Sequence, residues 1–224
     1  MPHEQLGIPS DELLSTTRAV RKRLDLERPV PREVLRECVE MAVQAPSGSN
    51  AQGWQFVFVA DADKRARIGE YYRQAFSQYR EMPIAIHKLH QGSGDRTLTQ
   101  SQQRSASSAD YLAENMGKVP CLFIPCIEGR TDGPGMANAA AQAGVFGSIM
   151  PAAWSFMLAA RARGLGTAWT SLHLMYEREI AELLGIPYER YMQVALIPVA
   201  YTQGRDFKPA YRPPVETVMH FDEW

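Results

Sequence analysis

The sequence predicts an α+β fold in which a mixed central sheet is flanked by helices. Apolar residues recur at helical spacing in the first 45 residues, and segments rich in β-branched and aromatic residues follow, separated by further helices. This order favours mixed strand pairing over a purely parallel sheet. The 224 residues are 45% hydrophobic and 22% charged, which is typical of one globular domain with its own core. We therefore expect a single domain over residues 1–224.

The composition argues against several classes of protein. The chain carries 24 basic and 25 acidic residues, a net charge of −1, which is unlike a strongly basic nucleic-acid-binding protein. The three cysteines, Cys38, Cys121 and Cys126, have no metal-ligand spacing, and we expect them to be reduced core residues. The first residues, MPHEQLGIPSDELL, contain no apolar signal core. We expect a cytoplasmic protein with no metal site and no nucleic-acid partner.

Two helices are predicted before the first strand. The first begins at Ser10, a candidate N-cap, and its apolar stripe continues to about Leu24. The second has Pro31 in its first turn, where the missing N–H is tolerated, and it ends at Pro46 and Gly48. A strand over residues 54–60 follows because β-branched and aromatic residues dominate there.

The middle of the chain contains a polar segment between a helix over residues 61–81 and a strand over 121–127. Residues 90–110, HQGSGDRTLTQSQQRSASSAD, contain one large apolar residue, Leu98. Such a segment is predicted to be a mobile loop that acts as a lid. A short helix over residues 110–116 precedes the second strand.

Residues 136–160 are mostly apolar, which raises the question of a membrane span. Four polar residues interrupt the stretch, and Pro151 lies inside it. We expect a buried helix, or two helices that break just before Pro151, and no membrane partner. Strands over 167–170 and 192–201 and a short helix over 177–184 complete the predicted elements.

The last residues, about 203–224, form a predicted arm. Pro209, Pro213 and Pro214 exclude a helix, yet several aromatic residues, including Trp224, make the segment too apolar for a free tail. Fully extended, a segment of about 22 residues reaches roughly 70 Å. The arm is therefore expected to be buried, first on a partner subunit and alternatively on its own domain.

Common catalytic motifs are absent from the sequence, and two local features remain. Arg18 and Arg21 fall on one face of the predicted helix and could bind a phosphate dianion, although a solvated basic face is the alternative. Residues 45–54, APSGSNAQGW, place the amides of Asn50 and Gln52 in a tight turn. This turn is either a ligand-binding loop or an ordinary connection. His173 follows a strand end, where a structural role is favoured over a site.

Taken together, these segments resemble the FMN-dependent nitroreductase family. The resemblance covers the Arg-x-x-Arg segment, Pro29-Val30-Pro31, APSGSNAQGW with QFVFV, PAAWSFMLAARARGLGTAW, the LLGIP turn and IPVAY with its arm. It implies an intertwined homodimer with an exchanged C-terminal arm, in which both chains contact each FMN. Residue by residue, it places the cofactor-binding groups at Arg18, Ala19, Val20, Arg21, Ser47, Ser49, Asn50, Gln52, Trp169, Thr170, Ser171 and Arg212.

The resemblance also implies a role for each group. Arg18, Arg21 and Arg212 match arginines that hold the FMN phosphate, and Asn50 and Gln52 match residues near the ring or ribityl chain. A backbone N–H or hydroxyl at Thr170 or Ser171 would bond flavin N5. The sequence departs from the family pattern at Ala19, where many members have serine, and at Gly53, where proline is common.

The implied activity is hydride transfer from NAD(P)H, through flavin N5, to a nitroaromatic, quinone or similar small planar acceptor by a ping-pong mechanism. The absence of a catalytic acid–base pair from the sequence agrees with this activity, because the flavin would carry the chemistry. Tyr72, Phe76 and Tyr79 could stack on the acceptor, or else pack in the core. The alternatives are a non-catalytic flavin sensor or carrier, or a relative that removes halogen reductively.

Overall fold

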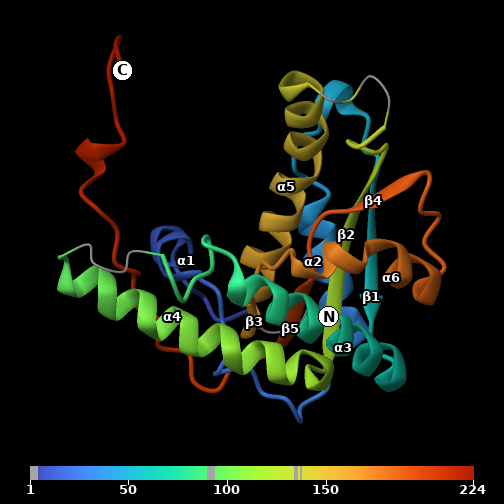
Figure 1. Cartoon of the computed structure of the whole chain (residues 1–224), viewed down its shortest axis with the longest axis horizontal. Helices are drawn as coiled ribbons and strands as arrows, with labels where there is room; N and C mark the ends of the chain where they lie inside the picture. The colour runs from blue at the N-terminus through green and yellow to red at the C-terminus, as the bar shows by residue number, and fades with distance from the viewer. Residues whose placement is uncertain (1–4, 90–93, 134–135, 137) are drawn as a thin grey trace.

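The computed structural model describes residues 5–89, 94–133, 136 and 138–224, and it contains a central sheet flanked by helices (Figure 1). Strands β1 (Trp54–Val59), β2 (Cys121–Glu128), β5 (Ile197–Tyr201) and β3 (Leu165–Thr167) are hydrogen-bonded in that order, and β4 (Tyr191–Gln193) pairs with β2. These pairs are all antiparallel. Among the described residues, parallel pairing is confined to isolated bridges such as that of Ala19 with Thr167. The predicted α+β fold is confirmed.

β2 forms the centre of the sheet because its side chains are apolar on both faces. Seven of its eight residues are buried, and β1 pairs with it from Trp54 opposite Ile127 to Val59 opposite Leu122. The single strand predicted over 192–201 is instead divided into β4 and β5. Between them, the N–H of Leu196 leaves the ladder and donates to the carbonyl of Thr170.

Helices cover both faces of the sheet. On one face, α2 (Arg32–Ala42) and α5 (Ala139–Ala162) enclose a core that includes Phe123 and Phe156. On the other, α3 (Ala62–Glu81), α4 (Arg96–Asn115) and α6 (Glu177–Leu184) contribute to a core around Ile124. Short 3-10 turns complete the chain at η1 (Gly48–Asn50), η2 (Met116–Lys118), η3 (Leu172–Tyr176) and η4 (Val215–Thr217).

The first helix is shorter than the apolar stripe predicts. α1 covers Ser10–Thr16, and the following residues are not helical, so Arg18 and Arg21 do not share a helix face. Tertiary pairing outweighs local propensity here, because the N–H of Val20 donates to the carbonyl of Thr167 on β3. Gly166 permits this close approach, since a Cβ there would lie 2.9 Å from Val20 Cγ1.

The polar segment predicted as a mobile lid is helical over most of its length. Residues 90–93 lie outside the described residues, but α4 begins at Arg96 and absorbs the short helix predicted over 110–116. Asp95 supplies the N-cap, accepting a 3.0 Å hydrogen bond from the N–H of Leu98. The low hydrophobicity of the segment hid this cap, and small residues such as Ala106 and Ala113 provide its buried contacts.

α5 continues through Pro151 as one helix, which decides between the two arrangements predicted for this stretch. Among the described residues, it alone is long and apolar enough to cross a membrane. Its buried side chains, including Ile149, Phe156 and Met157, pack in the cores between the sheet and α2. α5 is therefore a core helix of the fold.

Candidate functional site

A basic hollow forms where residues 18–23 cross the end of the sheet. Its volume is about 270 Å3, and it is lined by Arg18, Ala19, Val20, Arg21, Lys22, Arg23, Ser108, Asp206, Phe207 and Lys208. Arg18 Nη1 donates to the carbonyl of Lys208 at 3.0 Å, and Arg23 forms a 3.0 Å ion pair with Asp206. Asp206 is the one carboxylate among the described lining residues. The hollow therefore favours an anion.

Arg21 is the most enclosed of these cations. Burial lowers the pKa of its guanidinium, Tyr72 opposes this shift, and the neighbouring charge of Arg18 lowers the pKa further. Its Nη1 reaches the hydroxyl of Ser108 on α4 at 3.4 Å. An anion between Arg18 and Arg21 would relieve their repulsion and accept charge-assisted hydrogen bonds.

The strand end that follows β3 lies beside this basic segment. Thr170 Oγ1 donates to the carbonyl of Leu196 at 2.5 Å, and the Tyr72 side chain is hydrogen-bonded to Thr170. The proton of the Thr170 hydroxyl is therefore already donated to Leu196. The exposed Ser171 hydroxyl and the main chain remain as hydrogen-bond donors for a ligand. Trp169 is half-buried between two parts of the core.

The three aromatic residues considered for substrate stacking point inward to different degrees. Tyr72 and Phe76 are 4% and 5% exposed, and their rings stack with centroids 6.4 Å apart. Burial raises the pKa of Tyr72 to about 12, and the bond to Thr170 and the charge of Arg21 reduce the shift. Tyr79 is half-buried and accepts a 2.6 Å hydrogen bond from the N–H of Ile86. The structure thus gives these rings a place in the core, as the alternative interpretation expects.

The polar loop between α2 and β1 is exposed and conformationally strained. Ser49, Asn50 and Gln52 have φ angles of 53°, 53° and 50°, a left-handed region that residues with side chains rarely adopt. The Ser47 hydroxyl accepts from the N–H of Gln52 at 3.0 Å, and Gln52 Nε2 donates to Asn50 Oδ1 at 2.9 Å. Strain of this kind concentrates at functional sites.

One chain does not bring the loop and the basic hollow together. The loop lies on the first half of α5, where the N–H of Gly48 donates to Ser148 Oγ at 3.0 Å. The basic segment pairs with β3, which begins after α5 ends at Ala162 (Figure 1). At 1.5 Å per helical residue, Ser148 lies about 20 Å along α5 from Arg161, whose guanidinium packs on Phe207 of the basic hollow. The basic hollow with the adjacent strand end, and the polar loop, are therefore two separate candidate half-sites.

Arg212 belongs to neither half-site in this structure. It lies on the extended arm, and its Nη1 donates to the carbonyl of Tyr211 at 2.8 Å. The arm is anchored at its base, where Phe207 lies between the guanidinium groups of Arg23 and Arg161. Farther along, Tyr211 donates to Asp95 at 3.0 Å. Beyond this contact, the arm leaves the body of the molecule (Figure 1).

Residues 14–201 match the model of the nitroreductase family. The chain belongs to this family. It is similar to 5,6-dimethylbenzimidazole synthase of Rhodospirillum rubrum, with 26% identity over 162 residues that cover 72% of this chain and 68% of that protein. It is also similar to the putative NAD(P)H nitroreductase YodC of Bacillus subtilis, with 26% identity over 199 residues, 87% and 89% of the two chains.

A solved structure of similar fold is the FMN-dependent nitroreductase NfnB from Mycobacterium smegmatis in complex with NADPH. Its TM-score is 0.67 at 22% identity, over 96% of this chain and 98% of that one. For this member of the nitroreductase family, the described residues fit a flavin mononucleotide in two respects. The basic hollow suits a phosphate group, and the strained amide loop suits a polar heterocycle with donor and acceptor atoms.

The buried histidine and the three buried cysteines of this family member are structural. His173 is fully buried, and burial lowers its pKa to about 3, so its ring is neutral. Burial likewise raises the pKa of each of the thiols of Cys38, Cys121 and Cys126 to about 12, which makes them unreactive. No group of metal-ligating side chains occurs among the described residues.

The sequence concealed two contributors to the basic half-site. Tyr72 reaches Thr170 from α3, and Ser108 reaches Arg21 from α4. Apolar periodicity would have assigned Tyr72 to the buried face of its helix, but not to a hydrogen bond with a strand end. Ser108 lies in a segment whose polar composition predicts a loop, so no local signal could have found it.

Proposed function

We propose that this protein is an FMN-dependent oxidoreductase that transfers a hydride from NAD(P)H to a nitroaromatic, a quinone or a similar planar acceptor. The observation that carries the proposal is the basic hollow at Arg18 and Arg21, which Tyr72 connects to the strand end, because Tyr72 is hydrogen-bonded to Thr170 and interacts electrostatically with Arg21. An activity of this class is named for YodC and for NfnB. Membership of the same family supports it here.

The protein's own part in this reaction is to bind and orient. Arg18 and Arg21 would hold the phosphate by charge-assisted hydrogen bonds, with the main chain of Ala19 beside it, while the N–H of Val20 fixes this segment to Thr167. Thr170, held by Leu196 and Tyr72, would fix the strand end, so that the main chain and Ser171 can donate to the cofactor's N5 edge. FMN, when bound, supplies the hydride chemistry.

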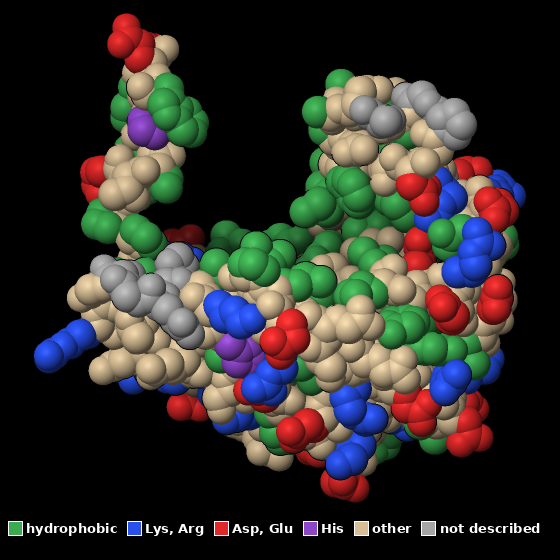
Figure 2. Space-filling view, in the orientation of Figure 1, with side chains coloured by type: hydrophobic (Ala, Val, Ile, Leu, Met, Phe, Trp, Pro, Cys, Tyr) green, Lys and Arg blue, Asp and Glu red, His purple; other side chains and the backbone are tan. Residues whose placement is uncertain are grey.

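The two separated half-sites support a homodimer. We propose that the loop with Ser47, Ser49, Asn50 and Gln52 from a second copy completes the site built on Arg18. Exposed hydrophobic side chains, including Val43, Met150 and Trp154, lie on α5 and just after α2. Figure 2 shows hydrophobic side chains on α5 and on the floor of the hollow between α5 and the arm. A second copy would bury this surface.

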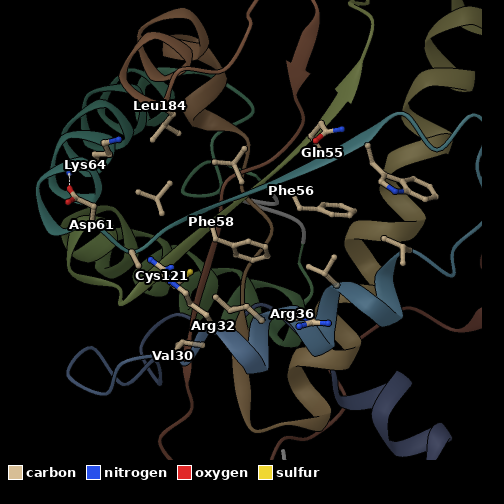
Figure 3. Close-up of a pocket in the computed structure, with 17 residues that line it drawn as sticks. Val30, Arg32, Arg36, Gln55, Phe56, Phe58, Asp61, Lys64, Cys121 and Leu184 are labelled. Carbon is tan, nitrogen blue, oxygen red and sulfur yellow. Dashed lines mark hydrogen bonds between the residues drawn. The ribbon is translucent and has the colours of Figure 1, made fainter. Parts of the chain in front are cut away.

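The arm is proposed to pack on the same second copy, in the groove along β1. β1 lies at the edge of the sheet, and no other described strand pairs with its outer side. The groove there has a volume of about 710 Å3, and Figure 3 shows Phe56 and Phe58 in it between α2 and α3. The arm exposes Val215, Val218 and Phe221. An extended apolar segment fits an open, apolar strand edge.

The experiment is to purify the protein, denature it and measure released FMN, and then to mix the holoprotein rapidly with NADH or NADPH. Flavin bleaching by either nucleotide, followed by reoxidation with menadione or nitrofurazone, is the expected result. A colourless protein that FMN does not stabilise against heat would refute the proposal. Bound FMN that neither nucleotide reduces would instead indicate a flavin sensor or carrier.

A further inference from the structure

A second basic hollow adjoins the first across α4. It has a volume of about 460 Å3 and is lined by Lys22, Gln103, Arg104 and Ser107. Lys22 lines both hollows, and two hydrogen bonds join consecutive cations to consecutive serines of α4. Arg21 reaches Ser108 at 3.4 Å on the side of the first hollow, and Lys22 Nζ donates to Ser107 Oγ at 2.8 Å on the side of the second.

The positive charge of the two hollows exceeds what one phosphate group requires. A phosphate monoester carries about two negative charges, and Arg18 and Arg21 can neutralise it. Asp206 already pairs with Arg23. Lys22 and Arg104 are exposed, and no carboxylate lines their hollow within the described residues. This surplus charge suits a second phosphate close to the first.

We propose that the second hollow binds the 2′-phosphate of NADPH, and that the protein therefore prefers NADPH to NADH. The inference rests on the proposed function, since that reaction needs a nicotinamide nucleotide as its hydride donor. Arginine commonly accommodates this phosphate in NADP-binding proteins. Arg104 and Lys22 would supply the charge. Ser107 Oγ accepts from Lys22, so its own proton is available to a phosphate oxygen.

Binding of a fragment tests the site without turnover. Adenosine 2′,5′-bisphosphate carries the 2′-phosphate, whereas 5′-AMP lacks it. In the holoprotein, Lys22→Gln with Arg104→Gln should weaken binding of the bisphosphate about tenfold or more, because two charge-assisted contacts are lost. Binding of 5′-AMP should change at least tenfold less. Equal weakening of both ligands, or no weakening of either, would overturn the proposal.

Reduction kinetics provide the second measurement. The double variant should raise the KM for NADPH at least tenfold more than the KM for NADH. Because Lys22 also lines the first hollow, Arg104→Gln alone is the variant expected to leave the FMN content unchanged. Arg96→Gln is the matched control, because Arg96 is an exposed cation on the same helix that lines neither hollow. If the double variant does not fold, the single change Arg104→Gln at an exposed position carries the same test.

The outcomes separate this inference from the proposed function. Wild-type protein that holds no FMN, or that neither nucleotide reduces, contradicts the proposed function itself. If both nucleotides reduce the wild-type protein with the same KM, and the double variant also has equal KM values for the two, only the role of the second hollow is contradicted.

Discussion

Thr170 Oγ1 donates its proton to the carbonyl of Leu196 at 2.5 Å and is also hydrogen-bonded to the Tyr72 side chain. The side chain of Thr170 thus links the strand end both to Leu196, just before β5, and to α3. In the proposed flavin site, Thr170 would fix the backbone rather than donate from its hydroxyl. The family resemblance assigns Thr170 and Ser171 the same role beside flavin N5, but these hydrogen bonds distinguish Thr170 from Ser171.

The first prediction compares these two neighbours. Thr170→Val removes both hydrogen bonds and should lower the free energy of unfolding by about 1–3 kcal/mol, because buried partners are left unsatisfied. Ser171→Ala should leave stability within about 0.5 kcal/mol, since Ser171 is exposed, but should alter the absorption spectrum of bound FMN. Urea denaturation of each variant, with a flavin spectrum of each, checks both halves. Equal stability loss in the two variants would contradict the assignment.

A second prediction concerns the phosphate. Arg18→Ala removes a guanidinium from the basic hollow and should weaken FMN binding by about 1.5–3 kcal/mol, which is roughly 10- to 150-fold. Arg212→Ala should have a comparable effect if the arm brings this residue to a phosphate in the dimer. Fluorescence titration of apoprotein measures both. Arg178→Ala is the control, because this exposed arginine pairs with Glu189 and lines neither basic hollow.

The sequence predicted the apolar elements well because their periodicity reports burial directly. β1, β2, α3 and α6 lie within about two residues of their predicted bounds. The prediction failed where pairing with a segment distant in the sequence outweighs the local helical propensity. Residues 17–24 have a helical apolar stripe, but pairing with β3 beside Gly166 gives them an extended path instead.

The site was predictable in its parts but not in its arrangement. Motif resemblance selected Arg18 and Asn50 together, although in one chain their two half-sites contact α5 about 20 Å apart. Local sequence contains no information on that separation, since it depends on which end of α5 each segment packs against. The contributions of Ser107 and Ser108 were hidden for a different reason, because polar composition masked the helix that carries them.

A third prediction tests the proposed dimer. Deletion of residues 213–224 removes most of the exposed apolar residues of the arm and should convert a dimer to a monomer at micromolar concentration. Val43→Glu, which places a charge in the groove along β1, should weaken the dimer without truncation. Light scattering after size-exclusion chromatography measures both. Ile84→Glu, exposed and outside that groove, is the control and should leave the mass unchanged.

The last prediction follows from His173. Its ring is fully buried with neither nitrogen hydrogen-bonded to described protein atoms, and burial lowers its pKa to about 3 from the ordinary 6.5. Between these values the unfolded chain binds a proton that the folded chain does not. Stability contributed by the neutral ring is therefore present above about pH 6.5 and falls with decreasing pH, by about 1.4 kcal/mol per unit. His173→Leu should flatten the slope of unfolding free energy between pH 6.5 and 5, measured by urea denaturation. An unchanged slope in this variant would show that other groups govern the loss of stability in acid. A flattened slope, with little change in the free energy of unfolding at pH 8, would show that the His173 ring destabilises the folded chain at low pH.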